Sequence, residues 1–487
     1  MSSRDVQRAT PTTGYRLPAT GFAGKRVTVM GLGTRGGGVG VARYLAEHGA
    51  IVTVTDGKTA NELAQPMSEL AGLPIRYVLG GHEEYDFTPA GADIVVRNPG
   101  VRRTSPWLRV AREAGVPIEM EMSLFFRLCP VPIIGITGTK GKTTTATLCA
   151  AMLAAWDERT VLAGNMGVSA LAQLDRITPE TPVVIEVSNW QLEALDEHRL
   201  SPDIAVLTNI SEDHLDTYDG FDDYAETKRS IARHQTRDDV LVVNADDPEA
   251  WKAVCSTEAR VIPFGANDRD GAGAWFSSGT LVLRHAAREV AIPIAPHLRS
   301  AGNHLLANVA AAAAAAWTRG APPASIVRGL SGFGGVRDRN EFVAEIDGVA
   351  YVNDTAATTP TATVAALHAY AARRIHLIAG GSDKRVGLAP LAEAAAARAA
   401  AIYLLDGTAT PRLRQLLDER GAAYQGPFAS MPSAVQTATA AARAGDVVLL
   451  SPGCASFGLF RDEFDRGEQF RQAVRALAGS PRGITTS

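Results

Sequence analysis

Short apolar runs recur along the chain and alternate with longer segments of helical pattern. Runs of this length and composition are typical of strands that are buried on both faces of a sheet. We expect strands at 75–78, 94–97, 132–136, 183–186, 204–209, 240–244, 349–353, 375–379, 402–405 and 447–450. The alternation predicts an α/β fold throughout, with sheets that are largely parallel.

Two interruptions divide the chain into three segments. Proline marks the first, in the sequence CPVP at 129–132, and a glycine cluster, GFGG at 332–335, marks the second. The 487 residues are enough for about three domains of typical size. We therefore expect a flexible tail at 1–20 and domains at 21–130, 131–335 and 336–487.

The first domain opens with a strand, a glycine-rich turn, a helix and a second strand over residues 25–56. Gly31, Gly33 and Gly36 satisfy the pattern G-x-G-x-x-G, and Asp56 ends the second strand about twenty residues later. In nucleotide-binding folds such a turn approaches phosphates, and the acid binds a ribose. The pattern predicts a Rossmann-like domain that binds a nucleotide-containing molecule.

The sequence IIGITGTKGKTTT at 133–145 has the layout of a phosphate-binding loop, because a buried strand leads into a glycine-rich turn and a helix. Backbone N–H groups and the positive end of the helix dipole would bind phosphate oxygens. A lysine there reaches the outer phosphates, and a threonine hydroxyl can hold Mg²⁺. Ile136 occupies the place of the usual first glycine, so the loop is a compact variant. Its candidate residues are Gly138, Thr139, Lys140, Gly141, Lys142, Thr143 and Thr144.

Three other residues of the second domain are candidates for chemistry. Glu186 ends a strand, at the edge of the sheet where α/β proteins place active sites, and would be a Mg²⁺ ligand or else a solvated glutamate. His214 follows another strand, beside Asp213 and Asp216, and could complete a metal site, although a surface loop is the simpler interpretation. Lys228 lies in a helical segment, where the pattern alone favours a solvated lysine.

Polar and glycine-rich runs also follow strands of the third domain. They are NDT at 353–355, GGSDK at 380–384 and SPGCAS at 451–456. Each run suits an ordinary turn, and glycines next to a lysine also suit anion binding. Because several such runs occur at strand ends in one domain, they favour a ligand site there.

Composition limits the class of protein. Hydrophobic residues make up 46% and charged residues 21%, which is ordinary for a globular protein. The net charge of −4 gives no sign of nucleic-acid or membrane binding, and no apolar run is long enough to span a bilayer. The four cysteines lack metal-ligand spacing and are typical of reduced thiols. We therefore expect a cytoplasmic protein with no nucleic-acid or membrane partner. A monomer is expected, although nothing in the composition fixes the oligomeric state.

Taken in order, these runs resemble the Mur ligase family, the ATP-dependent enzymes that build the peptide stem of peptidoglycan. TGTKGKTT is similar to the family's compact phosphate loop, and EVSNWQLE, TNISEDHLD and SPGCASFGLFRDEFDRGEQF most resemble its glutamate-adding member. The similarity covers nearly the whole chain after the tail. It implies a Rossmann-like first domain that holds a UDP-sugar, a central ATPase domain and a Rossmann-like third domain that brings glutamate.

The resemblance implies a reaction that adds D-glutamate to UDP-N-acetylmuramoyl-L-alanine in the synthesis of peptidoglycan precursors. The alanyl carboxylate would take the γ-phosphoryl group of ATP, and the glutamate amine would then displace phosphate from the acyl phosphate. ATP and Mg²⁺ would be required. Lys228 would be carbamylated, which turns a cation into an anion that can orient a second Mg²⁺.

The resemblance also assigns roles to the candidate residues. Those implied in catalysis are Lys142, His214 and Lys228, and the implied metal ligands are Thr143, Glu186, His214 and Lys228. ATP would contact the phosphate loop and also Asn308, Arg339 and Asp354. The residues implied for the UDP-linked substrate are Gly31, Gly33, Asp56 and Asn165, and those for glutamate are Lys384 and Ser456.

Four positions depart from the family pattern. Leu305 replaces an asparagine near the adenine, and Asp338 replaces the histidine of a His-Arg pair that opens the third domain. Ala356 replaces the lysine associated with the glutamate carboxylate, and Glu463 replaces an aromatic residue, with Phe464 one position later. The ATP machinery is retained and the glutamate pocket is altered, so L-glutamate is an alternative to D-glutamate.

Three other activities fit parts of the sequence. An NAD-dependent oxidoreductase would use the glycines of the first domain but leaves the phosphate loop unexplained. A folylpolyglutamate synthase has a similar ATP domain but lacks the Rossmann-like domain before it. An inactive nucleotide-binding homologue is disfavoured because Lys142, Glu186, His214 and Lys228 are all retained.

Overall fold

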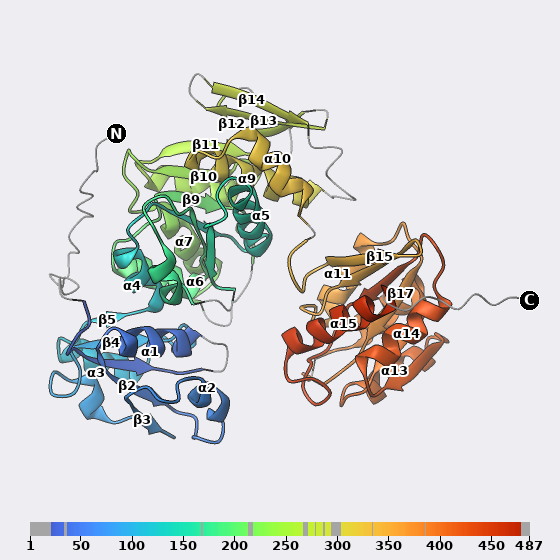
Figure 1. Ribbon diagram of the computed structural model, residues 1–487, viewed down its shortest axis with the longest axis horizontal. Coiled ribbons are helices and arrows are strands. Elements are labelled where there is room, and N and C mark those ends of the chain that lie inside the picture. The colour runs from blue at the N-terminus through green and yellow to red at the C-terminus, as the bar shows by residue number, and fades with distance from the viewer. Residues whose placement is uncertain are drawn as a thin grey trace, which may run out of the picture. The chain divides into compact units, whose positions relative to one another are not determined.

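The computed structural model describes residues 21–33, 37–166, 169–212, 218–265, 271–277, 279–285, 288–293, 303–333, 335–384 and 386–478. The chain divides into two units, Met1–Phe333 and Gly334–Ser487 (Figure 1). No helix in the described part of the chain is long and apolar enough to cross a membrane.

The first unit begins with a parallel sheet whose described strands lie in the order β3-β2-β1-β4-β5. The strands are β1 (Arg26–Met30), β2 (Ile51–Asp56), β3 (Ile75–Leu79), β4 (Ile94–Arg97) and β5 (Ile118–Glu119). The helices are α1 (Gly37–Glu47), α2 (Ala64–Glu69), η1 (Glu84–Phe87), α3 (Pro106–Glu113) and α4 (Glu121–Leu128). Val27 and Val29 of β1 share a core with α1, whereas Met30 packs with Leu108 of α3. Both faces of the sheet are buried, which explains the continuous apolar runs.

A second sheet of the same unit has the order β14-β13-β12-β11-β10-β9-β6-β8-β7 in the described residues. Its first strands are β6 (Ile133–Thr137), β7 (Val161–Gly164), β8 (Val183–Glu186), β9 (Ile204–Leu207) and β10 (Val240–Asn244). The others are β11 (Arg260–Phe264), β12 (Gly273–Ser277), β13 (Thr280–His285) and β14 (Arg288–Pro293). Neighbours from β7 to β12 are parallel, as predicted, whereas β13 and β14 add antiparallel pairs that the sequence did not predict.

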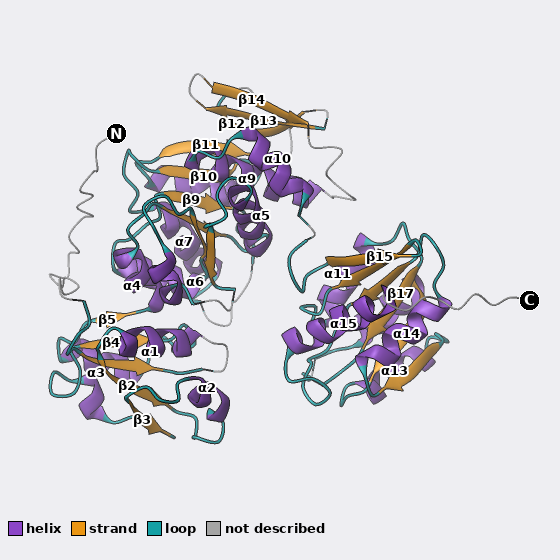
Figure 2. Cartoon of the chain, in the orientation of Figure 1, coloured by secondary structure: helices purple, strands orange, loops and turns teal. Residues whose placement is uncertain are grey.

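Helices cover both faces of this second sheet (Figure 2). One face packs against α5 (Lys142–Ala154), α9 (Asn303–Arg319) and α10 (Pro323–Ser331). The alanine run of α9 is buried there, and small side chains let α9 lie close to α5. The remaining helices are η2 (Leu171–Arg176), α6 (Asn189–Glu197), α7 (Phe221–Arg229), η3 (Ser230–Ala232), α8 (Pro248–Trp251) and η4 (Lys252–Ser256).

The two sheets of the first unit share one apolar core. It includes residues of β1 and β2 as well as residues of β6, β8 and β9. The helix α4 packs against α6 of the following segment. The predicted division at residue 130 therefore falls within a packed unit, and it stays a prediction.

The second unit contains a sheet with the order β15-β16-β20-β17-β18-β19 among its described residues. Its strands are β15 (Glu341–Ile346), β16 (Val349–Asn353), β17 (Ile375–Ala379), β18 (Ala399–Leu405), β19 (Tyr424–Phe428) and β20 (Val447–Leu450). All neighbours are parallel except β15 and β16. One face packs against α11 (Pro360–Ala369), α12 (Ala389–Arg398) and α13 (Thr410–Asp418), and the other against α14 (Met431–Ala441) and α15 (Glu463–Ala478).

Candidate active site

The predicted phosphate loop joins β6 to α5 at the carboxyl end of β6. Gly141 caps α5 with φ of 80°, and Gly138 has φ of 152°, so both occupy backbone conformations that favour glycine. A Cβ atom on Gly138 would overlap Thr208 Oγ1, and one on Gly141 would overlap Asn308 Oδ1. The glycines thus let the loop pack against the end of β9 and against α9, which brings the predicted ATP residue Asn308 to the loop.

The residues that follow β9 hold the loop in place. Asn209 Oδ1 accepts a hydrogen bond from Lys140 N at 2.8 Å, and Asn209 Nδ2 donates to Lys140 O at 2.9 Å. Thr208 Oγ1 donates to the same carbonyl at 2.7 Å. Sequence reasoning did not predict that Thr208 and Asn209 hold the loop. The sequence showed only that TNISEDHLD follows a buried strand, and it did not show that this strand pairs with β6.

Lys142, the first residue of α5, lies across the loop. Its Nζ donates to Gly138 O and to Thr139 O, each at 2.9 Å. Thr143 and Thr144 follow in the first turn of the same helix, where the helix dipole favours negative charge. The loop therefore places an ammonium group and a helix N-terminus together, which is a combination that binds phosphate.

Glu186 ends β8, which is paired directly with β6. Its side chain is only 1% exposed, and its Oε1 accepts a hydrogen bond from Asn165 Nδ2 at 3.0 Å. The other oxygen, Oε2, is buried without a hydrogen-bond partner among the described residues. A buried carboxylate oxygen without a partner is costly, and a cation would satisfy it, so Glu186 fits the role of a Mg²⁺ ligand. The contact also places the predicted substrate residue Asn165 beside the predicted metal ligand.

Lys228 is buried on α7, with 1% of its surface exposed, so the interpretation as a solvated lysine is wrong. Its Nζ donates to Asn189 Oδ1 and lies 5.0 Å from the centroid of the Tyr224 ring. Tyr224 OH and Thr139 Oγ1 are 2.9 Å apart. The tyrosine thus links the lysine's helix to the phosphate loop. Sequence reasoning missed Asn189 and Tyr224, because their partners are distant in sequence.

His214 lies outside the described residues, together with Asp213 and Asp216, so its predicted metal and catalytic roles stay predictions. Within the described ranges, no group of three or more His, Cys, Asp or Glu side chains gathers as a metal centre. Glu186 and the threonine hydroxyls in the first turn of α5 are oxygen donors of the kind that Mg²⁺ prefers.

The glycine turn of the first domain is braced by Asp56. Gly31 has φ of 88° and Gly33 has φ of 66°. The Asp56 carboxylate accepts backbone hydrogen bonds from Leu32 N at 2.9 Å, Gly33 N at 3.4 Å and Lys58 N at 2.9 Å. The predicted ribose-binding acid therefore fixes the turn that precedes α1, and its proposed contact with substrate stays a prediction.

Close approach of α1 to the glycine turn depends on Gly38. A Cβ atom there would overlap the carbonyl oxygen of Leu32. Gly36, the last glycine of the predicted fingerprint, lies outside the described residues. Because several glycines follow one another in this segment, the sequence did not show that Gly38 is the one that the packing of α1 requires.

Three polar loops of the second unit are brought together because β16, β20 and β17 are neighbours. Ser382 and Ala455 exchange backbone hydrogen bonds of 2.8 and 3.1 Å, which joins the loops after β17 and β20. Lys384 Nζ donates to Thr358 Oγ1 at 2.9 Å, in the segment after β16. The predicted glutamate residues Lys384 and Ser456 therefore lie on adjoining loops.

Asp354, which directly follows β16, is 5% exposed. Its carboxylate accepts hydrogen bonds from Ser451 Oγ at 2.8 Å and from Asn340 N at 3.2 Å. Burial raises the pKa of Asp354 to about 6, against the opposing effects of these two hydrogen bonds and of the Arg339 charge. The two predicted ATP residues of this unit, Arg339 and Asp354, are thus close enough to interact.

Arg466, which sequence reasoning missed, is fully buried beneath these loops. It donates from Nε to Thr355 Oγ1 at 2.9 Å, from Nη2 to Thr355 O at 2.9 Å and from Nη1 to Cys454 O at 3.2 Å. Burial lowers the pKa of Arg466 to about 10. The arginine ties the start of the segment after β16 to the segment after β20.

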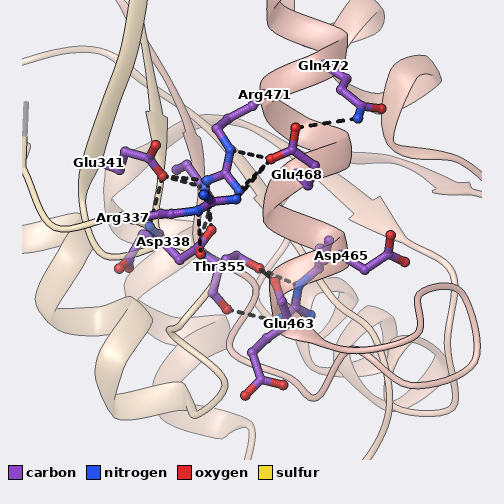
Figure 3. Close-up of polar contacts among 12 residues, drawn as sticks. Arg337, Asp338, Glu341, Thr355, Glu463, Asp465, Glu468, Arg471 and Gln472 are labelled. Carbon is purple, nitrogen blue, oxygen red and sulfur yellow. Dashed lines mark hydrogen bonds and ion pairs between the residues drawn. The ribbon is translucent and has the colours of Figure 1, made fainter. Parts of the chain in front are cut away.

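The departures from the family pattern have different environments. Leu305 packs against the apolar core beneath α9, and Ala356 is half-buried with its backbone N donating to Asp338 O at 2.9 Å. The side chain of Glu463 points away from the cluster around Arg471 (Figure 3), and its backbone oxygen accepts a hydrogen bond from Thr355 Oγ1 at 2.9 Å.

Three domain families match the chain in order. A Mur ligase MurD-like N-terminal domain matches residues 25–119, a Mur ligase middle domain matches 136–316, and a Mur ligase glutamate ligase domain matches 338–454. The chain belongs to the Mur ligase family. Membership confirms the predicted α/β organisation and sets aside the oxidoreductase alternative.

Relatives of this Mur ligase are similar over nearly their whole length. A UDP-N-acetylmuramoylalanine–D-glutamate ligase from Roseiflexus sp. (strain RS-1) is 49% identical over 467 residues, covering 94% of this chain and 99% of the relative. Proteins of the same name from Geobacter metallireducens and Treponema pallidum are 39% and 35% identical. The two alignments cover 95% and 93% of this chain, and 99% and 98% of the respective relatives.

Solved structures of other Mur ligases share the fold. The UDP-N-acetylmuramate-alanine ligase MurC from Thermotoga maritima matches with a TM-score of 0.57 and 19% identity, covering 94% of this chain and 100% of the other. MurF from Acinetobacter baumannii matches with a TM-score of 0.55 and 17% identity, covering 82% of this chain and 93% of the other.

Proposed function

We propose that this Mur ligase joins D-glutamate to UDP-N-acetylmuramoyl-L-alanine, with ATP converted to ADP and phosphate. The observation that carries the proposal is the convergence of the phosphate loop, Glu186 and buried Lys228 at one part of the central sheet. The relatives named as UDP-N-acetylmuramoylalanine–D-glutamate ligases support the choice of substrates.

The first step forms an acyl phosphate. An oxygen of the alanyl carboxylate attacks the γ-phosphorus of ATP, the bond between that phosphorus and the β,γ-bridging oxygen breaks, and ADP leaves. In the structure the Lys142 ammonium donates hydrogen bonds to the carbonyls of Gly138 and Thr139. In this step it turns from those carbonyls to the phosphate oxygens. Its charge then offsets the negative charge that develops.

Thr143, Glu186, His214 and carbamylated Lys228 are the proposed Mg²⁺ ligands. When bound, Mg²⁺ would neutralise charge on the phosphate oxygens. Glu186 Oε2 is buried and has no hydrogen-bond partner within the described ranges, which supports its part in this site. Carbamylation joins the neutral amine of Lys228 to the carbon of CO₂ with release of a proton, and the burial of the side chain supports it, because water is kept from the product.

The second step forms the amide. The amine of glutamate attacks the carbonyl carbon of the acyl phosphate, and phosphate leaves as the tetrahedral intermediate collapses. Lys384 and Ser456 are the proposed contacts of glutamate, and Asn165 with the glycine turn of the first domain is proposed to bind the UDP-linked substrate. We place the reaction in the cytoplasm, where ATP is available, and propose that the enzyme acts as a monomer.

The test is phosphate release from ATP with purified enzyme and UDP-N-acetylmuramoyl-L-alanine, with D-glutamate and L-glutamate in separate reactions. Release that requires D-glutamate supports the proposal and means that Ala356 is tolerated in the pocket. Release with L-glutamate alone would show that the altered pocket accepts the other stereoisomer. Release with neither amino acid would refute the ligase proposal. Light scattering during size-exclusion chromatography tests the monomer.

A further inference from the structure

The segment that carries Arg339 has an unusual backbone. Asp338 and Asn340, on either side of it, have φ values of 66° and 45°. Residues other than glycine adopt this left-handed conformation uncommonly, and aspartate and asparagine do so more readily than most. Arg339 N donates to Val336 O at 2.9 Å, which closes a tight turn. The turn carries an exposed arginine between two residues of positive φ.

Side chains from two other elements fix this turn. Asp338 Oδ1 accepts hydrogen bonds from Asn353 Nδ2 at 3.0 Å and from Arg471 Nη1 at 2.9 Å. The backbone N of Asp338 donates to Glu341 Oε2 at 2.8 Å, and Arg471 Nη1 donates to the same oxygen at 2.8 Å. The turn is therefore held both to the end of β16 and to α15.

Arg471 is the centre of the cluster (Figure 3). It lies on α15 and also donates from Nε to Glu468 Oε2 at 2.9 Å. Asp338 and Arg471 are each 4% exposed, so their charges are largely removed from water. Gly467 of α15 makes room for the Asp338 carboxylate, because a Cβ atom at position 467 would overlap Asp338 Oδ1. Three elements are thus shaped around one ion pair.

The charges of the pair depend on each other. Burial raises the pKa of Asp338, and the Arg471 charge opposes that rise. Burial lowers the pKa of Arg471, but the neighbouring carboxylates, Asp338 first, more than offset this and leave it raised. A neutral side chain at either position would leave the other buried charge without its partner, which is strongly unfavourable. The aspartate at 338, where the family pattern has a histidine, is matched to the arginine at 471.

The turn is also joined to Asp354, which directly follows β16. Asn340 N donates to Asp354 Oδ1, and the Arg339 charge lowers the pKa of the same carboxylate against the effect of burial. The position of Arg339 beside Asp354 therefore depends on the backbone that Asp338 fixes.

We propose that the buried ion pair of Asp338 and Arg471, here called the 338–471 latch, positions Arg339 beside Asp354 for binding of ATP. Both members are positioning residues that act through the turn. The proposal rests on the proposed function, together with the ATP contacts that the resemblance to the Mur ligases implies for Arg339 and Asp354.

The test compares Arg471→Met with Arg475→Met, a matched loss of an arginine from the same helix. Arg475 is 69% exposed, and its ion pair with Glu468 is 3.9 Å long. The measurements are the dissociation constant of MgATP by calorimetry and the KM for each substrate. We expect Arg471→Met to weaken MgATP binding about tenfold, as loss of a charge-assisted contact would. We expect no change in the KM for UDP-N-acetylmuramoyl-L-alanine and no effect of Arg475→Met.

A double-mutant cycle separates the latch from a general loss of stability. Once Arg339 is replaced by Met, Arg471→Met should weaken MgATP binding no further, because it acts through Arg339. Additive effects in the cycle would overturn the proposal. If Arg339→Met alone leaves MgATP binding unchanged while Lys142→Ala abolishes it, Arg339 has no ATP contact and the latch is overturned, while the nucleotide site of the proposed function stands.

Milder variants keep the test decisive if Arg471→Met does not fold. Asp338→Asn has nearly the same volume and keeps an acceptor for Asn353, but it removes the charge that faces Arg471. Arg471→Lys keeps the charge. We expect weaker MgATP binding in Asp338→Asn and partial recovery in Arg471→Lys relative to Arg471→Met. Wild-type binding in Asp338→Asn would overturn the proposal.

Discussion

Replacement of Asp354 by Asn should stabilise the second unit at neutral pH while it weakens ATP-dependent turnover. The folded-state pKa of about 6, against an ordinary value of 3.8, corresponds to roughly 3 kcal/mol, because one pKa unit equals about 1.36 kcal/mol. The carboxylate also accepts hydrogen bonds from Ser451 and Asn340. Asparagine can accept only through its one oxygen, which costs about 1 kcal/mol at every pH.

The direction of the pH effect on stability depends on whether Asp354 ionises first in the folded or in the unfolded chain. Well below pH 3.8 the carboxyl group is protonated in both the folded and the unfolded chain, and the raised pKa carries no penalty. As the pH rises toward about 6, the unfolded chain ionises first, so the stability of the wild-type protein falls. Asparagine does not ionise. We therefore expect Asp354→Asn to be about 0.5 kcal/mol less stable than wild type near pH 4, where part of the penalty is already present, and about 2 kcal/mol more stable near pH 7.

The assay must report on the second unit. All six tryptophans lie within residues 1–333, so tryptophan fluorescence does not follow residues 334–487. Urea titrations at pH 4 and pH 7, each read by a deuterium pulse on peptides of β16 and β20, measure the unfolding of this unit. Asp418→Asn removes an exposed acid from the same unit as a control. A difference between Asp354→Asn and wild type that does not change with pH would refute the reasoning.

Three further variants test the central domain. Lys142→Ala should abolish phosphate release, because it removes the ammonium group from the phosphate loop, and full activity in steady-state assays would contradict the assigned role. Lys228→Ala should lose activity that added bicarbonate cannot restore; ¹³C-labelled bicarbonate should give a carbamate NMR signal in wild type but not in this variant, and normal turnover of the variant would end the carbamate proposal. Gly138→Ala should raise the KM for ATP at least about tenfold, because its Cβ would overlap Thr208 Oγ1 and the loop must move; an unchanged KM would show that the loop accommodates a side chain.

Periodicity and local composition were sufficient for much of the fold. The strands at 94–97, 183–186, 240–244, 349–353, 375–379 and 447–450 have the predicted bounds, because each is a continuous apolar run with polar or turn residues beside it. The hairpin strands β12, β13 and β14 were missed, since their register depends on partners at the edge of the sheet. Strand β18 begins at Ala399, earlier than predicted, because its first residues are alanines that also suit a helix.

The candidate site could be predicted only in part. The order of residues around the phosphate loop was visible in the sequence, because a glycine turn between a strand and a helix is a local pattern. The burial of Lys228 was not visible, since it depends on Asn189 and Tyr224 from other parts of the chain. Arg466 was missed for the same reason, because its acceptors lie on two separate loops.

The sequence by itself determined the α/β class, the phosphate loop, the sets of polar residues at strand ends and the resemblance to the Mur ligases, because each of these is written in neighbouring residues. Only the tertiary structure decided which strand ends meet. It placed β20 between β16 and β17, joined Asp338 to Arg471 across 133 positions, and turned Lys228 into the interior. Strand order, burial and ion pairing arise from contacts between distant residues, and no local pattern specifies those contacts.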